Sequence, residues 1–166
     1  KACYIPVGHK SPKCLKKDAV IKKLKKILED PSIKKIGQNI KFDFIVFYKN
    51  GITLSSMEDT MLMSYVLDAG KNRHNMDTLS EIHLGHKTIS FKDMVGTGKK
   101  EINFSEVELD KAKDYAAEDA DVTFRLYKKF IKNLKSEKMI NIYEIFEKPL
   151  IKILAFMEIE GVEIDS

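Results

Sequence analysis

The sequence predicts one α/β domain, and three observations support this fold class. The chain has 166 residues, a length typical of a single domain. Hydrophobic residues make up 43% of the chain and charged residues 33%, so a packed core can form. Short strand-like runs alternate with amphipathic helical patterns. The strands are too few for a complete central sheet, so we expect this chain to hold only part of one.

The first part of the chain shows this alternation most clearly. The strand-like runs are residues 3–7, 33–36 and 52–54. Asp18 is expected to cap a helix that runs to about residue 29, with apolar side chains on one face and lysines on the other. The aromatic-rich run 39–48 predicts a second helix, closed by an Asn-Gly pair. A third helix is expected to open at Asp59.

Glycines break the middle of the chain, and a long helix follows. Repeated glycines between residues 68 and 101 predict short helices joined by loops. Ser105 and Glu108 have the spacing of a capping box, which predicts a helix from about residue 107 to 136. A last helical pattern covers about residues 139–160.

Composition argues against several protein classes. No apolar run approaches the ~20 residues that a membrane span needs, and the first residues lack the pattern of a secretory signal. Cys3 and Cys14 are too few for a disulfide framework, and no CxxC pair suggests zinc. His83 and His86 have a metal-type spacing, but a surface turn at the glycine between them is the favoured interpretation. We therefore expect a reduced, cytoplasmic protein without a membrane partner.

The charge of the chain leaves its partner open. The 29 basic residues outnumber the 25 acidic ones, and all of the basic residues except Arg73 and Arg125 are lysines. Clustered lysines can bind nucleic-acid phosphates. Lysine-rich solvated faces are common, however, and are the favoured interpretation from charge alone.

The first candidate acidic site is Asp43, which lies in an aromatic and aliphatic run. A carboxylate in such surroundings must be exposed at the helix start, hydrogen-bonded or bound to a cation. The simpler alternative is an acidic first-turn residue stabilised by the helix dipole. For this residue alone, both interpretations stay open.

The second candidate site pairs Tyr115 with Asp119, which are four residues apart and share one face of a helix. The small alanines beside them would let another chain or a substrate come close. A carboxylate and a phenol together could hold a hard cation and orient a water molecule. The alternative is a helix with a solvated acidic face, an interpretation that suits Glu118 and Asp121 well.

Together, the two sites resemble a known family. Asn39-x-x-Phe42-Asp43, followed by Tyr115-x-x-x-Asp119 on a long helix, resembles the second and third motifs of proofreading exonucleases with four acidic residues and a tyrosine. Further runs resemble family A DNA polymerases of the polymerase I type, in the same order: Tyr4-Ile-Pro-Val7, Gly37-Gln-Asn-Ile-Lys-Phe-Asp43, Asp59-Thr-Met-Leu62, Arg73-His-x-Met-Asp-x-Leu79, Gly85-His-Lys-Thr-Ile-Ser-Phe91 and Tyr115-Ala-Ala-Glu-Asp-Ala-Asp-Val-Thr123. The resemblance covers the chain from end to end.

The resemblance implies a ribonuclease-H-like exonuclease fold, in which helices flank a mixed sheet. The implied function is 3′-5′ exonuclease proofreading in DNA replication and repair. Two divalent ions, Mg²⁺ with Mn²⁺ able to substitute, would stabilise the attacking and leaving oxygens of phosphodiester hydrolysis. The implied substrate is a single-stranded DNA 3′ end, which releases nucleoside 5′-monophosphates, and the implied partner is the polymerase domain of the same parent chain.

The resemblance also implies roles for individual residues. Asp43 and Asp119 would be two of four metal-binding carboxylates, and Tyr115 would position the attacking water. Four residues would lie beside the DNA: Asn39 and Phe42 around the metal site, Phe91 stacked on the 3′ end, and Arg73 at a phosphate.

The first motif of that family, Asp-x-Glu on its first strand, is expected upstream of Tyr4. We therefore expect the chain to begin inside the third strand of the family sheet, with the first strands absent. Without the acidic pair, the isolated chain is expected to be weakly active or inactive, and open strand edges should make it marginally stable. The expected boundaries are 1–146 for the exonuclease domain and 147–166 for the start of the connection to the polymerase domain.

Two other functions stay open. A stand-alone exoribonuclease of the ribonuclease D type shares the carboxylate and tyrosine pattern, although the tail from Glu147 resembles the entry into a polymerase region. A non-catalytic domain that braces the polymerase is the second alternative. The presence of Asp43, Tyr115 and Asp119 together favours an active parent over it.

Overall fold

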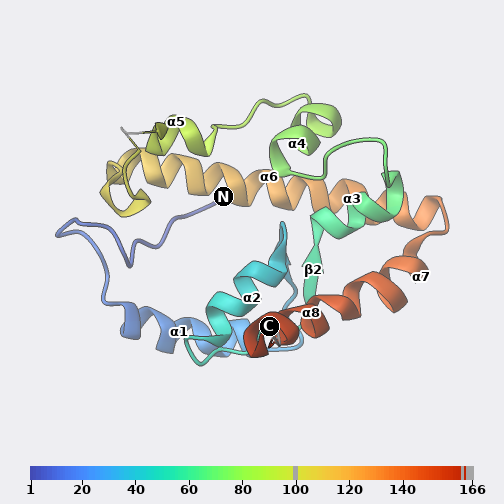
Figure 1. Ribbon diagram of the computed structural model, residues 1–166, viewed down its shortest axis with the longest axis horizontal. Coiled ribbons are helices and arrows are strands. Elements are labelled where there is room, and N and C mark those ends of the chain that lie inside the picture. Colours follow the sequence, from blue (N-terminus) through green and yellow to red (C-terminus); the bar gives the residue numbers. More distant parts are fainter. Residues whose placement is uncertain (99–100, 162, 164–166) are drawn as a thin grey trace.

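Two short parallel strands lie at the centre of the fold, with helices packed on both sides of them (Figure 1). In the computed structural model, β1 (Lys35–Gly37) pairs with β2 (Met57–Asp59), and Ile36 lies opposite Glu58. The connection between the strands contains the helix α2 (Ile40–Tyr48), because parallel strands need a crossover.

Helices form most of the remaining chain. The structure describes residues 1–98, 101–161 and 163, so part of the expected connection at 147–166 lies outside the described residues. The other helical elements are α1 (Lys17–Glu29), α3 (Thr60–Asp68), α4 (Met76–Leu84), α5 (Phe91–Val95), the 3₁₀ turn η2 (Phe104–Glu106), α6 (Leu109–Ser136), α7 (Ile140–Ile142), the π-helical segment η3 (Tyr143–Glu147) and α8 (Lys148–Glu160). The long helix α6 runs on one side of the strands, and α1, α2 and α8 lie on the other (Figure 1). Among these helices, none is both long and apolar enough to cross a membrane.

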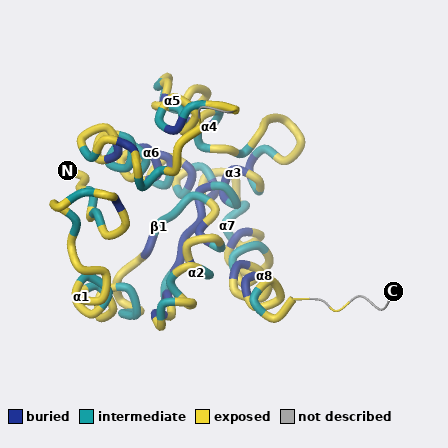
Figure 2. The backbone as a smooth tube through the Cα atoms, turned by 60° about the vertical axis from the view of Figure 1, so that its left-hand side comes forward, coloured by how far each residue is buried: buried dark blue, intermediate teal, exposed yellow. Residues whose placement is uncertain are grey.

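The described residues form three hydrophobic cores, and the two larger ones hold the layers together. The first joins α3 to α6 through fully buried side chains that include Met63, Val122 and Phe130. The second joins α2, β2 and α8 through Phe44 and Ile151. Figure 2 shows buried turns on α6 and α8 and a largely exposed α1, which has no buried residue. The second core therefore packs α2 against β2 and α8.

The α/β class and the predicted helices are confirmed. The helices expected near 18–29, 39–48 and 107–136 are found as α1, α2 and α6. The helix expected at Asp59 is α3, and the Asp59 side chain caps it by accepting the N–H groups of Met61 and Leu62.

The predicted strand at residues 3–7 is wrong. In the described part of the chain these residues form no strand, and the carbonyl of Pro6 accepts a hydrogen bond from the Leu15 amide at 2.9 Å. Leu15 lies in the connection that leads into α1. Residues 3–7 are therefore hydrogen-bonded to a loop rather than to the edge of a sheet.

The predicted strand at residues 52–54 is also wrong. The Ile52 amide donates to the Phe47 carbonyl at 3.0 Å, and the Thr53 amide donates to the Glu29 carboxylate at 3.0 Å. These backbone groups are bonded to the ends of α2 and α1, so strand pairing begins only later, in β2.

Two predicted caps are wrong as well. Asp18 lies in the first turn of α1, which begins at Lys17 without a side-chain cap. Ser105 lies in η2, which Asn103 caps, and α6 begins at Leu109 without a side-chain cap. Asp18 still meets the positive end of the helix dipole, which explains an acidic residue at that place.

Candidate active site

A hollow opens beside the end of β1, and residues of α2 and α6 line it. Its volume is about 570 Å³, and its walls include Gly37, Gln38, Asp43 and Asp119. Asp43 comes from the first turn of α2, and Asp119 comes from the middle of α6. The structure therefore brings the two predicted metal-binding carboxylates to one hollow, although they are far apart in the sequence.

The start of α2 is held by the carboxylate of Asp59 at the end of β2. Its Oδ1 accepts the Asn39 amide at 3.0 Å, and its Oδ2 accepts the Ile40 amide at 2.9 Å. The same Oδ1 accepts the Met61 amide at 2.8 Å, at the start of α3. Asn39 adopts the left-handed conformation, with φ 58°, as the chain enters α2. One buried side chain thus fixes the starts of two helices and, through α2, the place of Asp43.

Gly37 lets the end of β1 lie close to α2. A Cβ atom at this position would be 2.9 Å from both Cβ and Cγ1 of Ile40. Carbon atoms in favourable contact are ~3.5–4.0 Å apart, so a side chain here would push the helix away. The glycine therefore sets the short separation between the strand and the helix that carries Asp43.

The charged form of Asp43 is disfavoured by its surroundings. Part of the residue is open to solvent, but desolvation by the surrounding protein raises the pKa of its carboxyl group to about 6. The nearby charge of Asp59 adds to this rise. A cation in the hollow would oppose both effects.

Asp119 lies in a similar environment and has an oxygen without a partner. Its Oδ1 is buried and accepts no hydrogen bond from the described residues. Desolvation raises the pKa of this carboxyl group to about 6, the Tyr115 hydroxyl acts in the opposite direction, and the charges of Glu118 and Asp77 add to the rise. A buried acceptor without a partner is costly. This oxygen is therefore suited to a cation or a ligand donor.

The donor set of the hollow fits a hard divalent cation. Mg²⁺ is usually bound through one or two carboxylates together with water and substrate phosphates. Asp43 and Asp119 supply two carboxylates, and a bound cation would stabilise the charged form of both. Within residues 1–98, 101–161 and 163, no cluster of three or more His, Cys, Asp or Glu side chains could surround a metal ion. The other ligands would therefore come from water, from substrate or from outside these residues.

An aromatic cluster lies beside Tyr115. Phe91 at the start of α5 is 49% exposed, and its ring centre is 6.1 Å from that of Tyr115. Phe104 in η2 stacks on Phe91 at 5.9 Å and meets the Tyr115 ring at 5.9 Å. Burial raises the pKa of the Tyr115 phenol to about 12, and the charge of Asp119 adds to the rise. The structure thus joins Phe91 to the helix face that carries Tyr115 and Asp119.

The other three predicted DNA-binding residues are exposed and lie outside this cluster. Asn39 and Phe42 are at the start of α2, where 66% of Phe42 is exposed. Arg73 lies in the connection between α3 and α4 and does not line the hollow.

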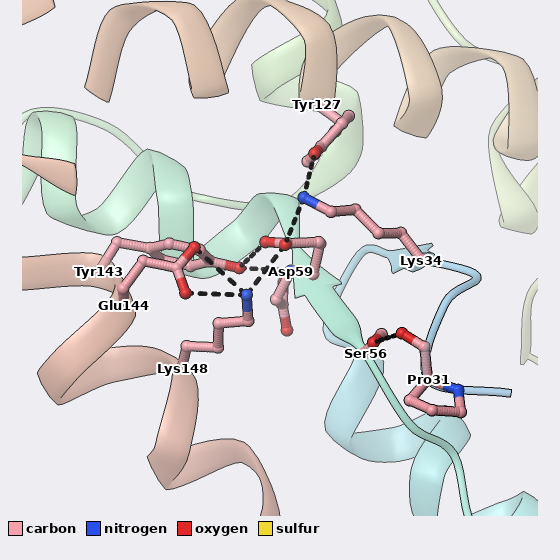
Figure 3. A network of polar contacts seen from close by, with 9 residues as sticks. Pro31, Lys34, Ser56, Asp59, Tyr127, Tyr143, Glu144 and Lys148 are labelled. Carbon is pink, nitrogen blue, oxygen red and sulfur yellow. Dashed lines mark hydrogen bonds and ion pairs between the residues drawn. The ribbon is translucent and has the colours of Figure 1, made fainter. Parts of the chain in front are cut away.

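A buried polar network behind the hollow was not predicted. Glu58 on β2 is 1% exposed and accepts hydrogen bonds from the Tyr143 hydroxyl at 3.0 Å and from Lys148 Nζ at 2.9 Å. Lys34 lines the hollow, lies 3.3 Å from the same carboxylate and donates to the Tyr127 hydroxyl at 3.4 Å (Figure 3). The network ties β2 to η3, α8 and α6.

The residues that the sequence analysis missed left weak signals. Glu58 is a charged residue directly before the helix cap Asp59, and Phe104 is an aromatic residue just before the long helix. Lys34 is one lysine among many, so nothing in the sequence distinguishes it.

Comparisons with known proteins find exonucleases and DNA polymerases. Residues 1–135 match the family described as 3′-5′ exonuclease. The DNA polymerase I of Rhizobium leguminosarum is 42% identical over 177 residues, which cover 99% of this chain and 17% of that protein. The DNA polymerase I of Pseudomonas aeruginosa is 40% identical over 174 residues, which cover 100% of this chain and 19% of that protein. The chain thus spans less than a fifth of the length of these relatives.

Two solved structures share the fold. One, described as the apo form of the nuclease, matches with a TM-score of 0.69 and 19% identity over 86% of this chain and 68% of its own. The other, Brucella melitensis NrnC bound to pGG, matches with a TM-score of 0.64 and 22% identity over 85% of this chain and 67% of its own. These likenesses confirm the predicted ribonuclease-H-like exonuclease fold.

Proposed function

This chain belongs to the 3′-5′ exonuclease domain family of the family A DNA polymerases, and we therefore propose that its hollow hydrolyses the last phosphodiester bond of a single-stranded DNA 3′ end. The products would be nucleoside 5′-monophosphates, and the role would be proofreading in replication and repair. One observation carries the proposal: Asp43 and Asp119 line the same hollow, and a buried oxygen of Asp119 lacks a donor among the described residues.

Asp43 and Asp119 are the proposed ligands of divalent metal, Mg²⁺ or a substituting Mn²⁺, with two ions in a complete site. Metal bound there would stabilise negative charge on the attacking and leaving oxygens. The raised pKa values support this assignment. Desolvation disfavours the charged form of each carboxylate, and a bound metal ion would stabilise that form again.

Tyr115 is the proposed positioning group for the attacking water. Its pKa of about 12 keeps the phenol protonated at neutral pH, so its hydroxyl can donate a hydrogen bond. Tyr115 and Asp119 are one helical turn apart on α6, so a water molecule between them could donate to the carboxylate while it accepts from the phenol.

The exposed aromatic cluster is the proposed contact for the DNA 3′ end. Phe91 presents half of its surface to solvent and is backed by Phe104, which suits stacking on a base. Arg73 would contact a phosphate, and Asn39 and Phe42 would line the approach to the metal ligands.

An apolar face on η3 and α8 is the proposed contact with a polymerase region of the same chain. Its most exposed residues are Ile145, Phe146, Ile153 and Met157. An apolar patch of this kind marks a protein interface, and the polymerase relatives extend well beyond the length matched here. The proposed domain boundary after residue 146 falls within this face.

The test is digestion of 5′-labelled single-stranded DNA with Mg²⁺ or Mn²⁺. It compares this chain with a form extended at its N-terminus to include the family's Asp-x-Glu motif. We expect the extended form to shorten DNA from the 3′ end, and Asp119→Ala to slow it at least ~10²-fold because a ligand is lost. Asp121→Ala removes an exposed carboxylate from the same helix and should leave the rate unchanged.

Other outcomes would support the alternatives. Preferential cleavage of a matched RNA oligomer would support an exoribonuclease of the ribonuclease D type. A folded but inactive extended form would support a bracing domain. Cleavage by this chain alone would contradict the expectation that the Asp-x-Glu pair is needed.

A further inference from the structure

Glu118 is the neighbour of Asp119 on α6. The alternative interpretation, in which Glu118 belongs to a solvated acidic face of the helix, is wrong. Its side chain is 19% exposed, and both carboxylate oxygens contact one loop. Oε1 lies 2.8 Å from His86 Nε2, and Oε2 accepts the Ile89 amide at 2.6 Å. Asp121, by contrast, has a side chain that is 60% exposed and lies 3.6 Å from Arg125.

The contacted loop, residues 85–90, joins α4 to α5. His86 is held against the middle of α4, because its carbonyl accepts the Ser80 hydroxyl at 2.8 Å. The Thr88 hydroxyl donates to Asp77 at 2.6 Å, again on α4. The next amide, that of Ile89, donates to Glu118 rather than to Ser80 or Asp77 of α4.

The loop leads directly into the aromatic cluster. Ser90 caps α5, and Phe91 is the first residue of that helix. A helix of five residues is too short to be stable by itself. Val95, at the far end of α5, packs in a small core with Val107 and Ala112. The near end, where Phe91 lies, follows the loop directly. α4 holds that loop on one side, and Glu118 holds it from the helix that also carries Tyr115 and Asp119.

We infer that Glu118 is a positioning residue, which fixes the 85–90 loop and thereby sets Phe91 at the correct place for the DNA 3′ end. This inference rests on the proposed exonuclease function. Glu118 and Asp119 are adjacent on one rigid helix. The distance between Phe91, the proposed DNA contact, and Asp119, the proposed metal ligand, is therefore fixed. Glu118 therefore acts on substrate binding rather than on the chemical step.

The first experiment needs no DNA. Amide hydrogen exchange is measured for the peptide that contains Ile89, in the whole polymerase chain that carries this domain. Glu118→Ala should speed exchange there about 10-fold or more, because the acceptor for the Ile89 amide is lost. Glu118→Gln keeps an acceptor oxygen and should restore most of the protection. Asp121→Ala, the matched control, should leave exchange unchanged, and unchanged exchange in Glu118→Ala would overturn the inference.

The second experiment separates binding from chemistry. With 5′-labelled single-stranded DNA, Glu118→Ala should raise KM about 10-fold while kcat stays within about 2-fold. Glu118→Gln should lie between Glu118→Ala and wild type. In a Phe91→Ala background, Glu118→Ala should raise KM no further, because both substitutions remove the same contact.

The outcomes distinguish this inference from the function on which it rests. A fall in kcat that persists in the Phe91→Ala background would overturn it, since Glu118 would then act through Asp119. A wild-type chain that neither binds nor shortens DNA would overturn the proposed function and this inference with it.

Discussion

The two carboxylates of the hollow are held in place by different forces. Asp119 stands on α6, a helix of 28 residues that is fixed along its length by buried side chains such as Leu126 and Phe130. Asp43 stands on α2, a helix of nine residues whose start depends on two amide hydrogen bonds to Asp59. Phe44 packs α2 into the second core as well, but the start of that helix, where Asp43 lies, is anchored by the single side chain of Asp59. Loss of packing around α6 should therefore lower the stability of the fold, whereas loss of Asp59 should also displace Asp43.

The largest expected effect comes from removing packing on the α6 side. Phe130→Ala should lower the free energy of unfolding by about 3–5 kcal/mol, because Phe130 is fully buried between α6 and its neighbours. Urea unfolding of the extended form would measure it. Phe124→Ala, at an exposed position of the same helix, should cost less than about 1 kcal/mol. Equal losses in the two variants would contradict the packing argument.

The next effect tests the polar anchor of α2. Asp59→Ala should lower the free energy of unfolding by about 2–4 kcal/mol, since it removes a helix cap and leaves the amides of Asn39 and Ile40 without an acceptor. It should also weaken Mn²⁺ binding about 10–100-fold by displacing Asp43, which calorimetry would measure. Phe130→Ala, studied where it is still folded, should leave Mn²⁺ affinity nearly unchanged. If Asp59→Ala lost stability but kept full affinity, Asp59 would not position Asp43.

The smallest effect is a pH dependence shared by both carboxylates. In metal-free protein, Asp43 and Asp119 have pKa values raised from 3.8 to about 6. A raised carboxyl pKa means that the folded state binds protons more tightly. The resulting stabilisation is present below about pH 4 and is lost as the pH rises through 6. After solvent screening it amounts to about 1 kcal/mol, or ~2–4 °C in Tm.

Thermal unfolding from pH 4.5 to pH 7.5, with and without Mg²⁺, would measure this dependence. Asp119→Asn and Asp43→Asn should flatten it, because an amide does not titrate in this range. Mg²⁺ should raise the Tm most at the higher pH. A slope that is the same in wild type and in both variants would place its origin elsewhere.

The sequence predicts the helices of this fold well, because their signals are local. The apolar residues of α6 recur every turn, and those of α2 form a nearly continuous aromatic and aliphatic run, so neighbouring residues reveal both helices. The Tyr115–Asp119 pair follows from the same period, which is why the helical spacing alone could place half of the candidate site on one helix face.

What the sequence could not predict depends on contacts between distant residues. The runs at 3–7 and 52–54 have strand composition, but a strand also needs a partner, and these backbone groups bond to loops and helix ends instead. Glu118 and Asp121 look alike in a helical pattern, yet only Glu118 meets the loop before Phe91. Hydrogen bonds of this kind leave no period in the sequence.

The close approach of β1 to α2 has a consequence for mutational tolerance. Any side chain at position 37 begins with a Cβ atom, and that atom already lies too near Ile40. The obstacle is a branched, buried side chain at the start of a helix, so it cannot swing aside as the tip of a lysine would. A selection for folded protein from a library randomised at codon 37 should return glycine almost alone, while a library at the exposed codon 121 should return nearly every amino acid.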